Sequence, residues 1–156
     1  MAVRDAFTAD EWRVVAAAPF LVGMYLVSVS PSGPIGVVTE MLTAEKAVTL
    51  EASRPDGLPI VQEIEADLMA GVLTRDLGRI NGGAGTQERV LVELGRALAL
   101  VEAQAPAMDS AFRAWLYREA QRLARVGPDA GGQGRAVSDD EAAALGILAD
   151  ILGVPR

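Results

Sequence analysis

The chain has 156 residues, a length that fits one domain with its own hydrophobic core. It contains neither cysteine nor histidine, which excludes disulfide bonds, thiolate or imidazole metal sites and the Ser-His and Cys-His pairs of nucleophilic enzymes. Acidic residues outnumber basic ones 21 to 14, and the resulting net charge of −7 argues against a broad nucleic-acid-binding surface.

The composition also indicates the fold class. Alanine is the most frequent residue, whereas aromatic residues make up 4% of the chain. Because alanine and leucine favour helices and aromatic residues favour strands, this composition predicts an all-α fold. Helical periodicity recurs in about six segments, which are joined by short loops containing glycine and proline. We therefore expect residues 1–156 to form a single-domain helical bundle.

The first predicted helix has a well-marked start. Thr8 and Glu11 have the spacing of a capping box, in which each side chain bonds to the backbone N–H of the other residue. Phe7 and Trp12 occupy the two positions of a hydrophobic staple, which fixes how the chain enters the helix. We expect this helix to continue to about Val29.

The body of this first helix is strongly apolar. No charge lies between Arg13 and Glu40, and residues 14–27 are almost all apolar. A membrane-spanning helix needs about 20 apolar residues, so this shorter run, which contains Pro19, favours a buried core helix. The alternatives are a helix at a membrane surface or at a protein interface, and a cleaved or membrane-spanning segment.

Apolar residues at helical spacing predict three helices in the middle of the chain, over approximately residues 34–52, 59–77 and 86–104. The first two of these helices contain several acidic residues: Glu40, Glu45, Glu63, Glu65 and Asp67. Di-iron bundles combine such glutamates with histidine, which this chain lacks. We therefore expect these acids to form a solvated acidic face.

The fifth predicted helix begins at Asp109 or Ser110 and has an apolar side that includes Phe112, Trp115 and Leu123. Its other face is expected to carry the charged residues Arg113, Arg118, Glu119, Arg122 and Arg125. The arginines at 118, 122 and 125 share one stripe of this helix. The stripe is either solvated or a patch for phosphate or an acidic partner.

A second capping box, from Ser138 to Glu141, predicts the sixth helix, which ends at Gly153. Carboxylates and carbonyls are the ligands that hard cations prefer. Asp129, Asp140 and Glu141 are therefore candidate ligands for a divalent cation such as calcium. The alternative is that these acids cap the helix and offset the positive end of its dipole.

The C-terminal part of the chain resembles TerB-like (tellurite-resistance) helical proteins. The resemblance rests on residues 112–116 (Phe-Arg-Ala-Trp-Leu), 137–141 (Val-Ser-Asp-Asp-Glu) and 145–153, which close on Leu-Gly. It implies a bacterial, cytoplasmic stress-response module with a divalent metal at the acidic loop. The first predicted helical hairpin resembles the family less closely. Glu40 lies there roughly at the position of the cap glutamate and is one of the implied metal ligands. In the loop of this hairpin, Ser32 stands in place of the family's Asp.

These observations predict a non-enzymatic cytoplasmic module that binds a protein partner or another copy of itself. Residues 14–38 are the best candidate interface if they are not wholly core. A carboxylate-based metal-binding protein and a membrane-surface-associated helical protein are the alternatives. A deep pocket holding a carboxylate with a strongly raised pKa would instead indicate an enzyme.

Overall fold

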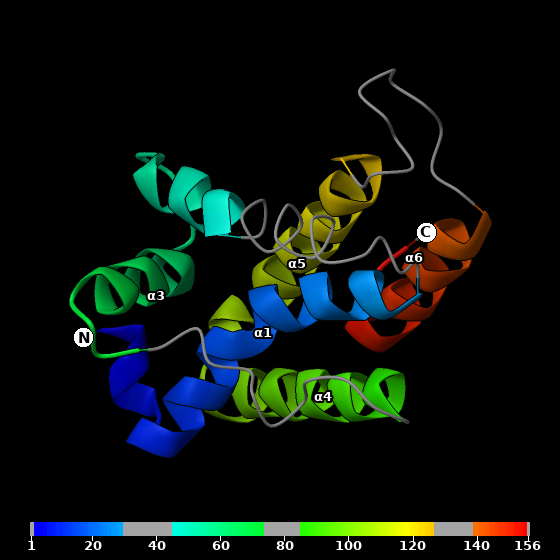
Figure 1. The fold of residues 1–156 in the computed structure, drawn as a ribbon. Coiled ribbons are helices and arrows are strands. Elements are labelled where there is room, and N and C mark those ends of the chain that lie inside the picture. The colour runs from blue at the N-terminus through cyan, green and yellow to red at the C-terminus, as the bar shows by residue number, and fades with distance from the viewer. Residues whose placement is uncertain (1, 30–44, 74–84, 127–138, 156) are drawn as a thin grey trace.

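The computed structural model describes residues 2–29, 45–73, 85–126 and 139–155, and every regular element in these ranges is helical (Figure 1). This confirms the predicted all-α fold. The elements are η1 (Val3–Ala6), α1 (Ala9–Val29), α3 (Pro59–Met69), α4 (Thr86–Gln104), α5 (Pro106–Val126) and α6 (Asp139–Leu152). Residues 45–53 are also helical and are called the helical segment 45–53.

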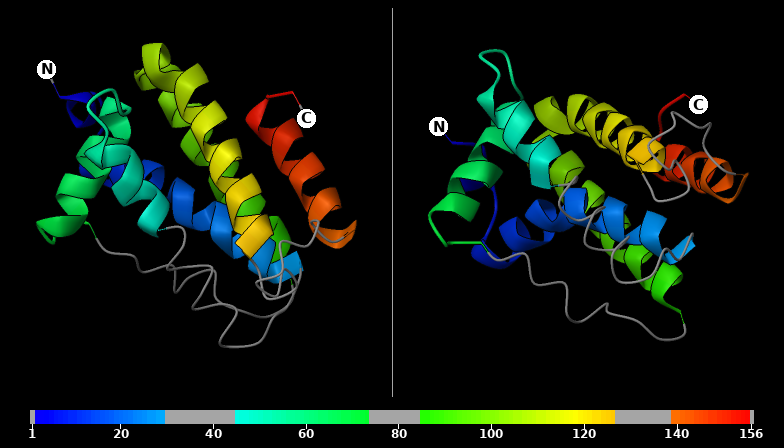
Figure 2. Two further views of the ribbon diagram at one scale, coloured as in Figure 1. Left: turned by 90° about the horizontal axis from the view of Figure 1, so that it is seen from above. Right: turned by 45° about the horizontal axis from the view of Figure 1, so that its top comes forward.

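Four helices enclose the main core. α1 packs against α4, α5 and α6, and α5 also packs against α4 and α6. Figure 2 shows α5 lying between α6 and the helical segment 45–53, so that two sides of this helix face different neighbours. The fully buried core side chains include Leu21, Leu26, Leu94, Phe112 and Leu148. Burial of such side chains is the dominant stabilising contribution to the fold.

The apolar run of α1 lies inside the protein. Phe20, Leu21 and Tyr25 are each 2% exposed or less. The candidate interface predicted at residues 14–38 is therefore mainly core over its described part, while residues 30–44 lie outside the described ranges. In the described ranges, no helix has the length and apolar character needed to cross a membrane.

The predicted start of the first helix is confirmed. The Thr8 N–H donates to a Glu11 carboxylate oxygen at 2.8 Å, and the Glu11 N–H donates to the Thr8 hydroxyl at 3.1 Å. The rings of Phe7 and Trp12 lie 5.8 Å apart between centroids, as a hydrophobic staple requires.

The expected solvated acidic face is wrong for two of its members. The Glu63 carboxylate accepts the backbone N–H of Val3 at 2.7 Å and of Arg4 at 3.0 Å. Asp67 is 4% exposed, pairs with Arg4 and accepts the indole N–H of Trp12 at 2.9 Å. These acids of α3 therefore hold η1 and the start of α1, a role that depends on residues about 55–63 positions away.

Two predicted helix boundaries also differ. α3 ends at Met69, before the predicted end near residue 77, and Val72 beyond it is 62% exposed. α5 begins at Pro106, before the predicted Asp109 or Ser110. Proline suits a first helical position because its fixed φ is already helical and its missing N–H would have had no partner there.

Candidate functional site

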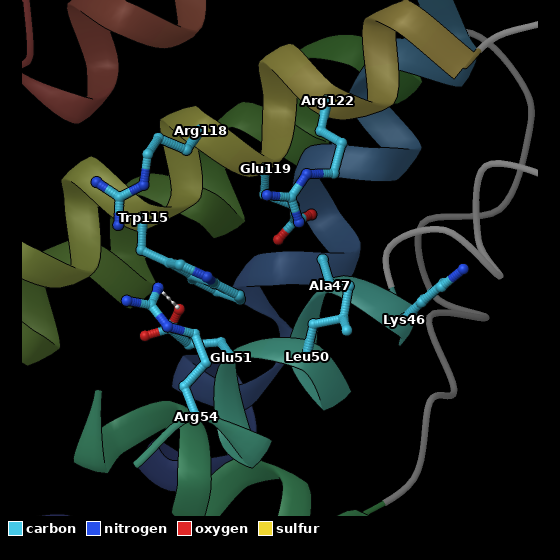
Figure 3. Close-up of a pocket in the computed structure, with 9 residues that line it drawn as sticks. All are labelled: Lys46, Ala47, Leu50, Glu51, Arg54, Trp115, Arg118, Glu119 and Arg122. Carbon is cyan, nitrogen blue, oxygen red and sulfur yellow. Dashed lines mark hydrogen bonds and ion pairs between the residues drawn. The ribbon is translucent and has the colours of Figure 1, made fainter. Parts of the chain in front are cut away.

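A cavity of about 310 Å³ lies between the helical segment 45–53, with the turn that follows it, and α5 (Figure 3). Its lining residues are Lys46, Ala47, Leu50, Glu51, Arg54, Trp115, Arg118, Glu119 and Arg122. Within each element these residues recur at intervals of about three or four, which places them on one face of the helix. The cavity is therefore formed by two helical faces that are far apart in the sequence.

One wall of the cavity contains Glu51, a buried glutamate with satisfied oxygens. One of its carboxylate oxygens accepts the Leu58 N–H at 2.9 Å, and the other pairs with Arg54 at 3.3 Å. The carboxylate thereby closes the turn that leads into α3. Gly57 is required in this turn, because a Cβ there would overlap the backbone carbonyl oxygen of Glu51.

The other wall contains Glu119, a buried glutamate without such partners. Glu119 is 2% exposed, and neither of its carboxyl oxygens is hydrogen-bonded to any described group. Figure 3 shows this carboxyl group directed from α5 toward the helical segment 45–53. A buried polar atom without a hydrogen bond costs about 1–3 kcal/mol, so the site gains from any molecule that supplies a partner.

Burial also changes the ionisation of Glu119. Removal from water raises its pKa well above the ordinary value of 4.5, and the nearby Arg122 guanidinium offsets only part of this effect. The group therefore keeps its proton at pH values where an exposed glutamate is ionised. A neutral carboxylic acid carries one O–H donor, whereas a carboxylate can only accept.

The rest of the lining combines apolar walls with positive charge. Trp115 and Ala47 are buried, and Leu50 is 47% exposed, so a bound molecule would contact apolar surface. Four bases line the cavity, namely Lys46, Arg54, Arg118 and Arg122. This is a local excess of positive charge in a chain whose net charge is −7.

The predicted assignment of Glu119 to the charged face of its helix is wrong. Glu119 is four residues after Trp115 and four before Leu123, and all three side chains are buried. This spacing was the available signal, because positions four apart lie on one face of a helix.

Arg113 departs from the predicted charged face as well. Its side chain is 19% exposed and bonds to Asp109 at 2.8 Å. It also donates to the carbonyl oxygens of Ile151 and Leu152 at 3.4 and 3.3 Å. This arginine therefore supplies hydrogen bonds to the last carbonyl groups of α6.

The residues predicted to bind a divalent cation are only partly described. Asp129 and Glu40 lie outside the described ranges. Asp140 is exposed in the first turn of α6, whereas Glu141 beside it is buried and has interaction partners. Among the described residues, no three acidic side chains cluster in a way that could hold a metal ion. Calcium binding at the full set stays a prediction.

No family model, no curated protein and no solved structure matches this chain. The resemblance to TerB-like proteins therefore stays a prediction.

Proposed function

We propose that this protein binds a small organic molecule in the cavity between the helical segment 45–53 and α5. The observation that supports this proposal is Glu119, a buried carboxyl group that faces the cavity without a hydrogen-bond partner among the described residues. The cavity volume of about 310 Å³ falls at the lower end of the range for small-molecule sites. Its lining has the usual composition of such sites, with apolar walls and a few polar groups.

Binding is favoured over catalysis by the remaining chemistry of the lining. A carboxyl group with a raised pKa in a pocket is the feature expected of an enzyme, and Glu119 has it. A general acid also needs a nucleophile, a second proton carrier or a cofactor to complete a reaction. Glu51 is occupied by Leu58 and Arg54, and no hydroxyl or amide side chain is among the described lining residues. Lys46 supplies the one amine of the described lining and is exposed, whereas an amine nucleophile is activated by desolvation.

A titration followed by ¹H–¹⁵N NMR tests the proposal. The probes are benzoate, benzamide and benzamidinium, which share one ring and differ in the charge and hydrogen bonding of the head group. We expect at least one probe to shift both the Trp115 indole N–H and the Ala47 amide, since these residues lie on opposite walls of the cavity. Glu119→Gln should change the order of affinities, because it replaces the acid by a nearly isosteric amide.

Arg96→Gln is the matched control, because Arg96 is on α4, is 62% exposed and is not part of the cavity. It should bind every probe as the wild type does. If no probe at millimolar concentration shifts either Trp115 or Ala47, the cavity does not bind ring-sized molecules and the proposal is wrong.

The interaction and stress-response roles predicted from the sequence stay predictions. The described part of the candidate interface, in α1, is packed against α4, α5 and α6. The pocket is therefore the described feature that best supports a function.

A further inference from the structure

We propose that the cavity takes a small organic carboxylate together with a proton, and that Glu119 binds this ligand as a neutral acid. In the complex the Glu119 O–H donates to one ligand oxygen, while Arg122 and Arg118 attract the ligand's negative charge. This inference rests on the proposed function, because it assigns a ligand class to the same site.

The charges of the lining favour an anionic head group. Lys46, Arg54, Arg118 and Arg122 surround the cavity, and the negative charge of Glu51 is already paired with Arg54. A cationic ligand would meet these bases at close range. An anion is attracted by them, and an arginine guanidinium offers the paired donors that match a carboxylate.

The apolar walls favour an anion that also has an apolar organic group. The ring of Trp115 and the side chains of Leu50 and Ala47 form the surface between the charged groups. An inorganic anion would leave this apolar surface uncovered. A carboxylate attached to a ring or a short hydrocarbon chain covers it and gains from the burial.

The buried carboxyl group sets the proton requirement. If Glu119 were ionised, its buried negative charge would face the ligand carboxylate, and the two groups would repel one another. One proton shared between two such groups removes the repulsion and forms a short, charge-assisted hydrogen bond. Free protein that has lost the Glu119 proton must therefore take one up from solvent when the anion binds.

The other charged and titratable groups near Glu119 do not remove the need for this proton. From α5 it faces Arg118 and Arg122, and from the opposite wall Lys46, Glu51 and Arg54. Residues 14–29 of α1 carry no charged side chain, and Tyr25 stays neutral because burial raises its pKa. α4 and α6 contribute no described residue to the lining.

Isothermal titration calorimetry with benzoate tests the inference. At each pH from 5.5 to 8.5, titrations in two non-phosphate buffers that both buffer at that pH and differ in ionisation enthalpy give the number of protons exchanged. We expect uptake to approach one proton per benzoate as the pH rises above the pKa of Glu119. In that range the Kd should rise about tenfold per pH unit.

Two variants separate the acid from the positive charge. Glu119→Gln keeps an N–H donor that does not titrate, so benzoate should bind with no proton uptake and with a Kd independent of pH. Arg122→Gln should weaken benzoate binding at every pH while retaining the proton uptake. An NMR spectrum of each variant establishes that it is folded.

Three results would overturn the inference in distinguishable ways. Benzoate binding without proton exchange, at a pH where NMR of the Glu119 carboxyl carbon shows it ionised in the free protein, would leave the pocket function intact and remove the role of the acid. Tighter binding of benzamidinium, with proton release, would show that Glu119 acts as an ionised counter-ion. Failure of every probe to bind would overturn the proposed function and this inference with it.

Discussion

Two buried glutamates on opposite walls of one cavity show how a single residue's role depends on its partners. Glu51 and Glu119 are both less than 10% exposed. Glu51 accepts the Leu58 N–H and pairs with Arg54, so its carboxylate closes a turn. Glu119 has no such bonds to described groups, and burial raises its pKa. Glu51 therefore stabilises the fold, whereas Glu119 destabilises it unless the carboxyl group keeps its proton or gains a hydrogen-bond partner.

Glu119→Gln should therefore stabilise the ligand-free protein in a pH-dependent way. The pKa of Glu119 in the folded protein is raised above its ordinary value of 4.5. The stability that the protonated Glu119 contributes is therefore fully present below pH 4.5, and it is lost as the pH rises toward the pKa in the folded protein. Relative to the variant, the wild type should lose about 1.4 kcal/mol of unfolding free energy per pH unit over that interval. Urea denaturation of both proteins between pH 4 and pH 8 measures this difference. A difference that is the same at every pH would contradict the prediction.

At the scale of elements, the turn between the helical segment 45–53 and α3 has little tolerance for change. Glu51, Arg54 and Gly57 approach one another closely there, and the Gly57 N–H donates to the Arg54 carbonyl at 3.0 Å. The same turn places Glu51 and Arg54 on the cavity wall. A change in its backbone would therefore alter both the stability of the turn and the shape of the cavity.

Two glycine-to-alanine substitutions test this view of the turn. Gly57→Ala should destabilise the protein by about 1–3 kcal/mol, because the new methyl group overlaps the Glu51 carbonyl and the backbone must move. Gly95→Ala is the matched control inside α4, where a Cβ would meet no atom within 4 Å. It should stabilise by about 0.5–1 kcal/mol, since alanine favours a helix over glycine. Thermal melts of both variants give the signs, and equal signs would refute the argument.

At the scale of the whole molecule, the described helices form a core of α1, α4, α5 and α6 and a flank of η1, the helical segment 45–53 and α3 (Figure 1). The cavity lies where the flank meets α5. The buried Asp67 joins the flank to the core, because it accepts the indole N–H of Trp12 in α1. Loss of this connection should loosen the flank before it affects the core.

Asp67→Ala should destabilise the attachment of α3 by about 1–3 kcal/mol, because it leaves the buried Trp12 N–H without an acceptor. Hydrogen exchange should then accelerate in the amides of α3 and stay unchanged in those of α4. Glu65→Ala is the control on the same helix. The described bond of Glu65 is from the exposed Thr49 hydroxyl at 3.3 Å, so its loss should cost about 0.5 kcal/mol or less. Equal acceleration of hydrogen exchange in α3 and α4 would contradict this prediction and show that the flank and the core unfold as one unit.

The sequence by itself determined the helical class and most starts and ends of the helices that the structure describes. The capping box at Thr8 and Glu11 acts within one turn, so it could be predicted without knowing any other element. Only the tertiary structure decided the roles of Asp67, which was expected on a solvated acidic face, and of Glu119, which was expected on the charged face of its helix. Burial, hydrogen-bond partners and pKa depend on side chains from distant parts of the chain, such as Trp12 for Asp67. Local periodicity contains no information about which helices pack together. The cavity forms only because the helical segment 45–53 packs near α5.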